Sequence, residues 1–275
     1  MSAVDRWREQ LEAWAIPPEL VATAPESPYG FPAAAFRRRG ERLRTTETPS
    51  PTTVRADEAL PDGGTVVDVG CGGGATSLPL AGRAGLVIGV DAQEDMLEGF
   101  LANARAAGIA ARVVHGGWPA VERDVGSADI ALAGHVLYNV SDLAPFIRAL
   151  ARTAPRVVLE LTDRHPLHWM NDLWLRFHGL ERPEGPTADD AVAAIGELGF
   201  GVHLERWTTA PATVGFDRRQ YAVALVRRRL CLDASRDHEI AAALGDRLTE
   251  GDGHWSVGAP GDRPLATIWF GGTAS

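Results

Sequence analysis

The amino-acid sequence predicts an α/β domain in which seven strands form a mostly parallel, doubly wound sheet between two layers of helices. Short runs rich in β-branched residues alternate with helical segments from residue 65 onward, which is typical of a parallel sheet wound with helices. The first run leads directly into a glycine-rich turn, and the last follows a turn-rich stretch at 258–264. These three observations predict a three-layer fold with a site for a polar ligand beside the glycine turn.

The expected strands are short, and most of them are apolar. They span residues 65–69, 86–90, 111–115, 128–133, 156–161, 200–207 and 265–270. Helices between them are indicated by apolar side chains four positions apart, such as Leu143 and Ile147. Thr187 is expected to cap a helix before the sixth strand, and residues 217–248 are expected to form a helical insertion before the seventh.

The N-terminal part of the chain differs from the rest. Trp7 and Trp14 recur at helical spacing, after which prolines interrupt the chain. We expect residues 1–59 to form an N-terminal helical cap and linker, and residues 60–275 to form the main domain. The arginines within 37–44 fit either a site for an anion or a solvated helix face.

The composition excludes several classes of function. With 27 basic and 36 acidic residues, the chain has a formal net charge of −9, so it has no general positive field to attract a nucleic acid. Every basic residue is arginine, which excludes Schiff-base chemistry on lysine and the lysine of a phosphate-binding loop. The two cysteines are too few for a disulfide framework, and no apolar run is long enough to span a membrane. We therefore expect a cytoplasmic protein with neither nucleic acid nor membrane as partner.

The turn after the first expected strand carries the clearest chemical signal. From residue 65 the sequence reads TVVDVGCGGGA. Glycines in this turn permit a left-handed backbone and the close approach of a ligand, and the helix expected next would offer N–H groups at its first turn. Gly70, Gly72 and Ala75 also fit the G-x-G-x-x-A pattern of dinucleotide-binding folds, with Asp91 placed to bind a ribose. The glycines alone therefore leave an NAD-dependent oxidoreductase as one alternative.

Asp68 favours a different cofactor. A carboxylate two positions before the first glycine lies inside a buried strand, where it costs free energy unless it is hydrogen-bonded. Asp68 followed by Gly70, Gly72 and Gly74 resembles the first motif of the class I S-adenosylmethionine-dependent methyltransferases. The resemblance extends over most of residues 60–161. It implies a Rossmann-like fold, with S-adenosylmethionine as cofactor and S-adenosylhomocysteine as product.

The same resemblance implies the roles of the cofactor-binding residues. The acid of the first motif would organise the loop around the methionine moiety, and Asp91 would hold both ribose hydroxyls. The third strand of the family usually ends in an acid, whereas this chain has Gly117 and Trp118, whose backbone and ring would replace the usual adenine contact. The full expected set is Asp68, Gly70, Cys71, Gly72, Gly74, Asp91, Ala92, Met96, Gly117, Trp118, Gly134 and His135.

Candidate catalytic residues follow the fourth and fifth strands, at the edge of the sheet where ligands bind. His135 and Tyr138 follow the fourth strand, and His165 follows the fifth. His135 is a candidate base for an acceptor hydroxyl, since an imidazole has a pKa near neutrality; the alternative is that it lines the cofactor.

The connection after the fifth strand is unusually long and rich in histidine and aromatic residues. We expect residues 162–190 to form a substrate lid, because such connections usually carry function. Helical spacing of Trp169, Leu173 and Phe177 fits a core instead. No metal is expected, since the histidines of this segment match no known ligand spacing.

Two absences narrow the acceptor. Residues 134–138 read GHVLY, where DNA adenine methyltransferases carry Asn/Asp-Pro-Pro-Tyr, and neither Cys71 nor Cys231 stands where enzymes that methylate pyrimidine carbon 5 place their nucleophile. The resemblance therefore implies methyl transfer to an oxygen, nitrogen or carbon of a small molecule. A non-catalytic module that binds S-adenosylmethionine is a further alternative. The sequence leaves the oligomeric state open, with a homodimer among the arrangements it allows.

Overall fold

The computed structural model describes residues 1–29, 48–210, 216–251 and 253–271. Its centre is a seven-stranded sheet in the order β3-β2-β1-β4-β5-β9-β6. Neighbouring strands are parallel, except that β9 runs antiparallel to β5 and to β6. The strands are β1 (Thr65–Val69), β2 (Leu86–Asp91), β3 (Ala111–His115), β4 (Ile130–Gly134), β5 (Arg156–Thr162), β6 (His203–Thr209) and β9 (Arg263–Gly271). The predicted fold class is confirmed.

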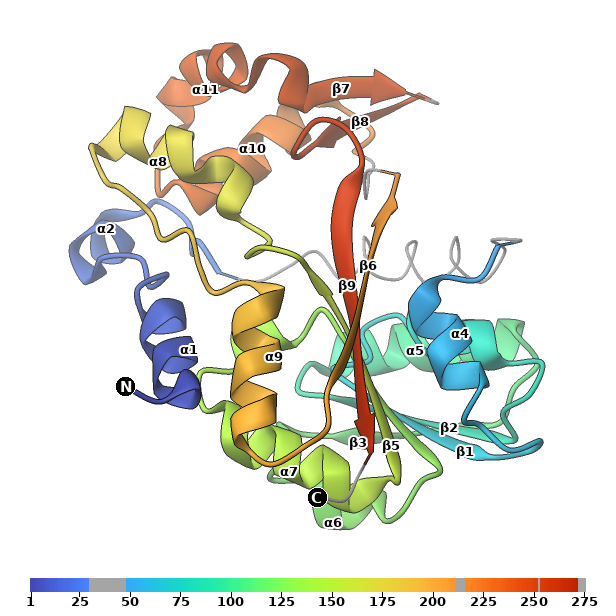
Figure 1. Ribbon diagram of the computed structural model, residues 1–275. Helices are drawn as coiled ribbons and strands as arrows, with labels where there is room; N and C mark the ends of the chain where they lie inside the picture. The colour runs from blue at the N-terminus through green and yellow to red at the C-terminus, as the bar shows by residue number, and fades with distance from the viewer. Residues whose placement is uncertain (30–47, 211–215, 252, 272–275) are drawn as a thin grey trace.

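Helices cover both faces of this sheet (Figure 1). One core packs α1, α7 and α9 against the strands, and a second core packs α4 and α5 against the opposite face. The helices are α1 (Ala3–Glu12), α2 (Pro18–Thr23), α4 (Pro51–Asp57), α5 (Glu94–Ala106), α6 (Glu122–Val125), α7 (Leu143–Thr153), α8 (Asn171–His178), α9 (Ala188–Glu197), α10 (Arg219–Arg229) and α11 (Asp237–Leu244).

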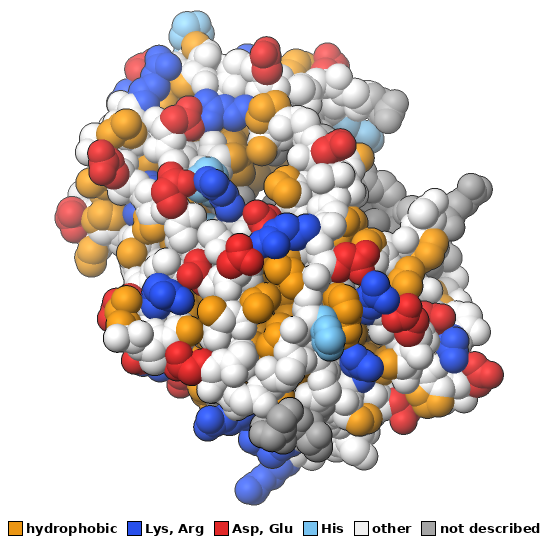
Figure 2. Space-filling model, viewed as in Figure 1, with side chains coloured by type: hydrophobic (Ala, Val, Ile, Leu, Met, Phe, Trp, Pro, Cys, Tyr) orange, Lys and Arg blue, Asp and Glu red, His pale blue; other side chains and the backbone are white. Residues whose placement is uncertain are grey.

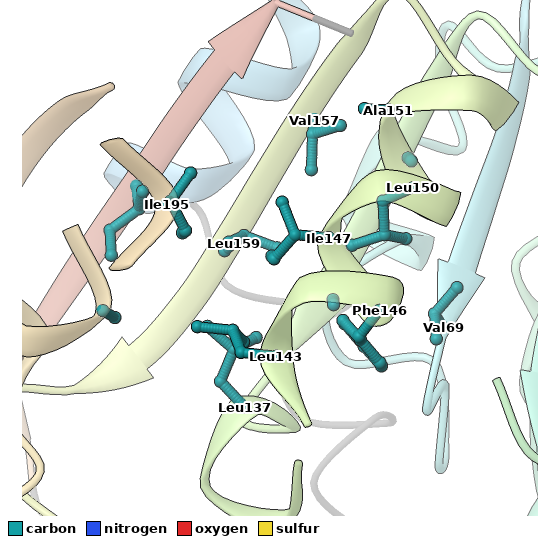
Figure 3. Packing of buried hydrophobic residues seen from close by; sticks show 14 of the residues in the cluster. Val69, Leu137, Leu143, Phe146, Ile147, Leu150, Ala151, Val157, Leu159 and Ile195 are labelled. Carbon is teal, nitrogen blue, oxygen red and sulfur yellow. The ribbon is translucent and has the colours of Figure 1, made fainter. Parts of the chain in front are cut away.

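The central strands are apolar because both of their faces are covered. In β5, every residue from Val157 to Thr162 is buried. Figure 3 shows the first core from close by, where Ile147 of α7 lies beside Leu159 of β5. The apolar residues four positions apart, which predicted this helix, therefore form the face that packs against the sheet.

A third core lies beyond the strand ends and is built from segments that leave the same edge of the sheet. Residues 163–187 follow β5, and residues 210–262 connect β6 to β9. We call α8, α10, α11 and the small hairpin of β7 (Leu248–Gly251) and β8 (His254–Val257) the insertion cluster (Figure 1). Its core contains Met170, Leu173, Trp174, Val223, Val226, Leu230, Ile240 and Leu244. The carboxyl edge is thus partly covered by a unit with its own apolar core.

Two features of the chain differ from the sequence prediction. The glycine turn continues into successive turns and a short 3₁₀ helix at Leu78–Leu80, not into an α-helix. Pro79 lacks an N–H and its ring would clash with the carbonyl four residues earlier, so an α-helix is disfavoured here. The β7–β8 hairpin was not predicted, because its strands are only four residues long and carry little apolar pattern.

The N-terminal helices contribute to the cores of the sheet. Trp7 of α1 belongs to the first core, and Ala56 of α4 belongs to the second. The boundary predicted between residues 59 and 60 stays a prediction, and the arginines within 37–44 lie outside the described residues. Within the ranges that the structure describes, no helix combines the length and the apolar character needed to cross a membrane.

Candidate functional site

Four strand ends meet at one edge of the sheet and bring the predicted polar residues together. β1, β2, β4 and β5 are parallel neighbours, so their carboxyl ends lie side by side. Gly134 at the end of β4 is in register with Glu160 of β5. The glycine turn, Asp91 and His135 therefore converge at this edge, as expected for a ligand site in an open α/β sheet.

The glycine turn touches the end of β4, because glycines on both sides of this contact have no side chain. Gly70, Gly72 and Gly74 have φ values of +68°, +49° and +83°, in the left-handed region that favours glycine. A Cβ on Gly70 would lie 2.4 Å from Cγ2 of Val136, and a Cβ on Gly134 would lie 2.0 Å from Oγ1 of Thr76. Residues 134–136 and the glycine turn are therefore in direct contact.

Asp68 is buried beneath this turn. Its Oδ2 accepts a hydrogen bond of 2.6 Å from the Ser77 hydroxyl, while Oδ1 is buried and makes no hydrogen bond within the described residues. The pKa of Asp68 is raised to about 7, mainly by burial and to a smaller extent by the nearby carboxylates of Asp91 and Glu160, while the hydrogen bond from Ser77 opposes the shift. A buried carboxylate oxygen without a donor marks a site that a polar ligand would complete.

Asp91 joins the glycine turn to the end of β2. Its Oδ2 accepts the backbone N–H of Gly72 at 3.0 Å, and its Oδ1 accepts the N–H of Gln93 at 3.0 Å. The side chain is half-buried, and each carboxylate oxygen can accept more than one hydrogen bond. Asp91 can therefore fix the turn and still accept hydrogen bonds from ribose hydroxyls.

The other expected cofactor residues surround this carboxylate. Ala92 is exposed and its carbonyl contacts Nε2 of His115 at 3.1 Å, whereas Met96 is buried on α5. Trp118 donates its indole N–H to the carbonyl of Phe146 at 3.2 Å, which fixes the orientation of the ring. Cys71 is buried, and burial raises the pKa of its thiol well above the usual range, so this thiol stays protonated and is no nucleophile.

Comparison with known proteins finds a matching family. Residues 66–155 match the family model of a methyltransferase domain. The matched segment, which is less than half of the chain, is similar to this methyltransferase domain. The matched segment runs from β1 to the end of α7 and so contains the glycine turn, Asp91 and His135.

Solved structures show the same fold. The YcgJ protein of Bacillus subtilis aligns with a TM-score of 0.51 and 19% identity, over 80% of this chain and 97% of that one. A candidate methyltransferase of Bacillus halodurans C-125 aligns with a TM-score of 0.51 and 14% identity, over 82% and 100% of the two chains. No curated protein matches the chain.

The end of β4 in the matched segment carries a histidine in an unusual backbone conformation. His135 has φ +60°, which is uncommon for a residue other than glycine. Its Nε2 lies 2.9 Å from Oε1 of Glu160, and its backbone N–H donates to the Glu160 carbonyl at 2.6 Å. The sequence analysis missed Glu160, although a glutamate inside the apolar strand RVVLELT was a signal that could have found it.

The other two predicted catalytic residues lie in an aromatic cluster at the end of β5. Tyr138 is buried, donates its hydroxyl to the carbonyl of Thr162 at 2.7 Å and stacks on Trp7 at 5.8 Å. Burial raises the pKa of the Tyr138 phenol. The structure brings Tyr138 and His165 into edge contact, with ring centroids 5.4 Å apart. A protonated Tyr138 that donates to the backbone fits a role in holding this segment.

His165 stacks on Trp14 with ring centroids 3.8 Å apart. The pKa of His165 is lowered to about 3, mainly by burial and to a smaller extent by the charge of Arg182, so the imidazole is neutral at physiological pH. Nδ1 of His165 accepts the backbone N–H of Leu167 at 3.2 Å. The catalytic roles given to Tyr138 and His165 by the sequence stay predictions.

The predicted lid segment is tied to the N-terminal helices. Trp14 donates its indole N–H to the carbonyl of Gly185 at 2.6 Å. The guanidinium of Arg182 lies over the rings of Trp14 and Trp174, 5.5 and 4.9 Å from their centroids, and donates to the carbonyls of Trp14 and Ala15. This contact between residues far apart in the sequence was not predicted.

The remaining histidines of the segment have separate partners. Nε2 of His168 lies 2.8 Å from Oε2 of Glu184, and Nε2 of His178 lies 2.7 Å from the carbonyl of Leu230. Leu173 is buried in the third core, and Trp169 and Phe177 pack against it. Among the described residues, no three side chains of the metal-binding types come together.

Proposed function

We propose that the protein transfers the methyl group of S-adenosylmethionine to a small-molecule acceptor bound between the carboxyl edge of the sheet and the insertion cluster. The observation that carries this proposal is the buried Asp68 carboxylate, with Oδ1 lacking a donor among the described residues, beneath three left-handed glycines. The matched family model is that of a methyltransferase domain, so it lends no support to the NAD-dependent alternative.

The residues at this edge fit the cofactor. Asp68 and the N–H groups of the glycine turn would hold the methionine moiety, and Asp91 would accept the ribose hydroxyls. Met96 and Trp118 would flank the adenine, as the family resemblance implies. When bound, the cofactor supplies an electrophilic methyl group on a positively charged sulfur.

The acceptor is proposed to bind under the predicted lid of residues 162–190. Both long connections of the insertion cluster leave the carboxyl edge of the sheet, one from the end of β5 and the other from the end of β6. Their separate core gives them the rigidity to exclude water from an acceptor held there. The acidic charge balance and the two free cysteines support a cytoplasmic location as part of this proposal.

Calorimetric titration with S-adenosylmethionine, S-adenosylhomocysteine and NADH tests the proposal. We expect binding of the first two only. Asp91→Ala should weaken binding of S-adenosylhomocysteine at least about tenfold, because it removes an acceptor of charge-assisted hydrogen bonds. Asp95→Ala is the matched control, since Asp95 is exposed in the first turn of α5. Binding of NADH alone, or equal affinities in the two variants, would contradict the assignment.

A further inference from the structure

The pair formed by His135 and Glu160 carries an inference about the acceptor. Two contacts join the residues: Nε2 to Oε1 at 2.9 Å, and the backbone N–H of His135 to the carbonyl of Glu160 at 2.6 Å. Both residues are held by adjacent central strands, where Gly134 is in register with Glu160. The orientation of the imidazole is therefore fixed from both its backbone and its side chain.

This pair is costly to the fold. Only 8% of Glu160 is exposed, so its carboxylate exchanges water for protein partners, one of which is His135. His135 also holds a left-handed backbone at φ +60°, a strained conformation that persists mainly where the surroundings enforce it. Burial and strain at the same pair, on the ligand-binding edge of the sheet, indicate a functional role.

The pair also lies against the cofactor-binding turn. The residues on either side of His135 touch that turn: Gly134 approaches Thr76, and Val136 approaches Gly70. The charge of Glu160 acts on Asp68 beneath the turn. His135 is thus placed between the glycine turn and β5, close to the proposed position of the transferred methyl group.

We propose that Glu160 is a positioning residue that holds His135 as the Nε2–H tautomer, and that His135 takes a proton from a hydroxyl group of the acceptor. This inference rests on the proposed function and narrows its acceptor to a phenol or an alcohol. A carboxylate that accepts from Nε2–H leaves the basic lone pair on Nδ1. A neutral hydroxyl becomes a good nucleophile only as its proton leaves, whereas a neutral amine already has a reactive lone pair.

The transfer balances with these groups alone. The acceptor oxygen forms a bond to the methyl carbon, the bond between that carbon and sulfur breaks, and its electron pair stays on sulfur. The hydroxyl proton passes to Nδ1 of His135 and later to water. The products are the methyl ether, S-adenosylhomocysteine and one proton.

Nitrogen NMR of the histidine side chains tests the positioning role without any acceptor. Spectra of neutral imidazoles distinguish the two tautomers, and His135→Asn assigns the signal, since asparagine tolerates a left-handed backbone. We expect a single Nε2–H tautomer in the wild type, a mixture in Glu160→Leu, and the single tautomer again in Glu160→Gln, whose amide oxygen still accepts. Glu184→Leu is the matched control: it removes the exposed partner of His168 and should leave the His135 signal unchanged.

Methyl transfer from labelled S-adenosylmethionine to simple phenols, alcohols and amines tests the acceptor class. We expect product from hydroxyl compounds, a kcat about 10²-fold lower in Glu160→Leu, and a KM for S-adenosylmethionine that changes little, because the lost interaction acts on proton transfer. Where Glu160→Leu does not fold, Glu160→Gln replaces it, with kcat about tenfold lower because the charge that stabilises the imidazolium is gone.

Two results would overturn the inference alone: a wild-type His135 in the Nδ1–H tautomer, or a tautomer that Glu160→Leu leaves unchanged. Absence of product from every hydroxyl compound would overturn the acceptor class. Failure of the wild type to bind S-adenosylmethionine would instead overturn the proposed function, and the inference with it. Calorimetry on the wild type separates these cases.

Discussion

Near the carboxyl ends of β1 and β5 the chain buries carboxylates, whereas the insertion cluster buries aliphatic and aromatic side chains and turns its ion pairs toward solvent. Asp68 and Glu160 are buried at the first region. In the second, Met170, Leu173 and Leu230 form an apolar core, and ion pairs such as Arg247 with Asp172 involve exposed carboxylates. On the face shown in Figure 2, the acidic and basic side chains of the described residues are interspersed.

The comparison separates stability from chemistry. Apolar burial stabilises a fold by roughly 25 cal/mol per Å², so the insertion cluster is held by ordinary packing. Buried carboxylates and left-handed backbone cost free energy, so the carboxyl edge depends on the surrounding sheet. We therefore expect substitutions in the cluster to change folding, and those at the edge to change ligand binding.

The largest effect is expected from Leu230→Ala, which deletes a fully buried side chain of the third core. It should lower the free energy of unfolding by about 2–5 kcal/mol, through lost transfer energy and a cavity. Denaturant unfolding measures this change, and calorimetry should show nearly unchanged affinity for S-adenosylhomocysteine. Leu175→Ala is the control, since 52% of Leu175 is exposed on α8. Equal losses in the free energy of unfolding for the two variants would contradict the expectation that the third core stabilises the fold.

A second prediction distinguishes two effects of adding a side chain to a left-handed glycine: backbone strain and close contact with a neighbouring residue. Gly70 and Gly63 have nearly equal φ values of +68° and +71°, but an added Cβ meets Val136 at Gly70 and nothing within 4 Å at Gly63. Each alanine should cost about 1 kcal/mol in backbone strain. Only Gly70→Ala should also weaken S-adenosylhomocysteine binding, by at least about tenfold, because the turn must move away from β4. Similar affinities for the two variants would show that the contact with Val136 does not shape the site.

Asp68 at the carboxyl edge and His165 in the lid segment should make stability respond to pH in opposite directions. The pKa of Asp68 is raised to about 7 in the fold, so its favourable contribution is present below about pH 4 and is lost as pH rises through 7. The pKa of His165 is lowered from 6.5 to about 3, so its contribution is present above pH 6.5 and is lost as pH falls through 3.

Chemical denaturation of the ligand-free protein across pH 3–8 tests these signs. Asp68→Asn should flatten the loss of stability between about pH 4 and 7, and His165→Phe should flatten the loss between about pH 6.5 and 3. The carboxylates of Glu160 and Asp91 also raise the pKa of Asp68, but burial contributes more. Variants of Glu160 or Asp91 should therefore keep part of the pH dependence of stability that Asp68 causes. A stability profile that Asp68→Asn leaves unaltered would mean that this carboxyl titrates normally.

The smallest effect concerns the tie between the N-terminal helices and the lid segment. Trp14→Phe keeps a ring that stacks on His165 but removes the indole donor to the carbonyl of Gly185. We expect a loss of about 1 kcal/mol in the free energy of unfolding, the usual cost of one hydrogen bond. Trp118→Phe removes an indole donor to Phe146 instead. Trp118→Phe should change the affinity for S-adenosylhomocysteine, which Trp14→Phe should leave unaltered.

The sheet was predictable because its patterns are local. The runs at 65–69, 86–90 and 111–115 begin where the structure begins β1, β2 and β3, since a strand covered on both faces must be apolar. Thr187 caps α9 as predicted, with Asp190 completing a reciprocal capping box. The prediction of an α-helix after the glycine turn was wrong. It gave more weight to the glycine pattern than to Pro79, which disfavours an α-helix.

The sequence by itself determined the fold class, the glycine turn and the carboxylates at Asp68 and Asp91, because periodicity, turn chemistry and motif spacing are properties of short segments. The tertiary structure alone decided that Glu160 pairs with His135, that Tyr138 donates to the backbone, and that Trp14 and Arg182 tie the first helices to the lid segment. Those contacts join residues from different strands or from segments far apart in the sequence, and their partners are fixed by strand order and packing, which no local pattern encodes.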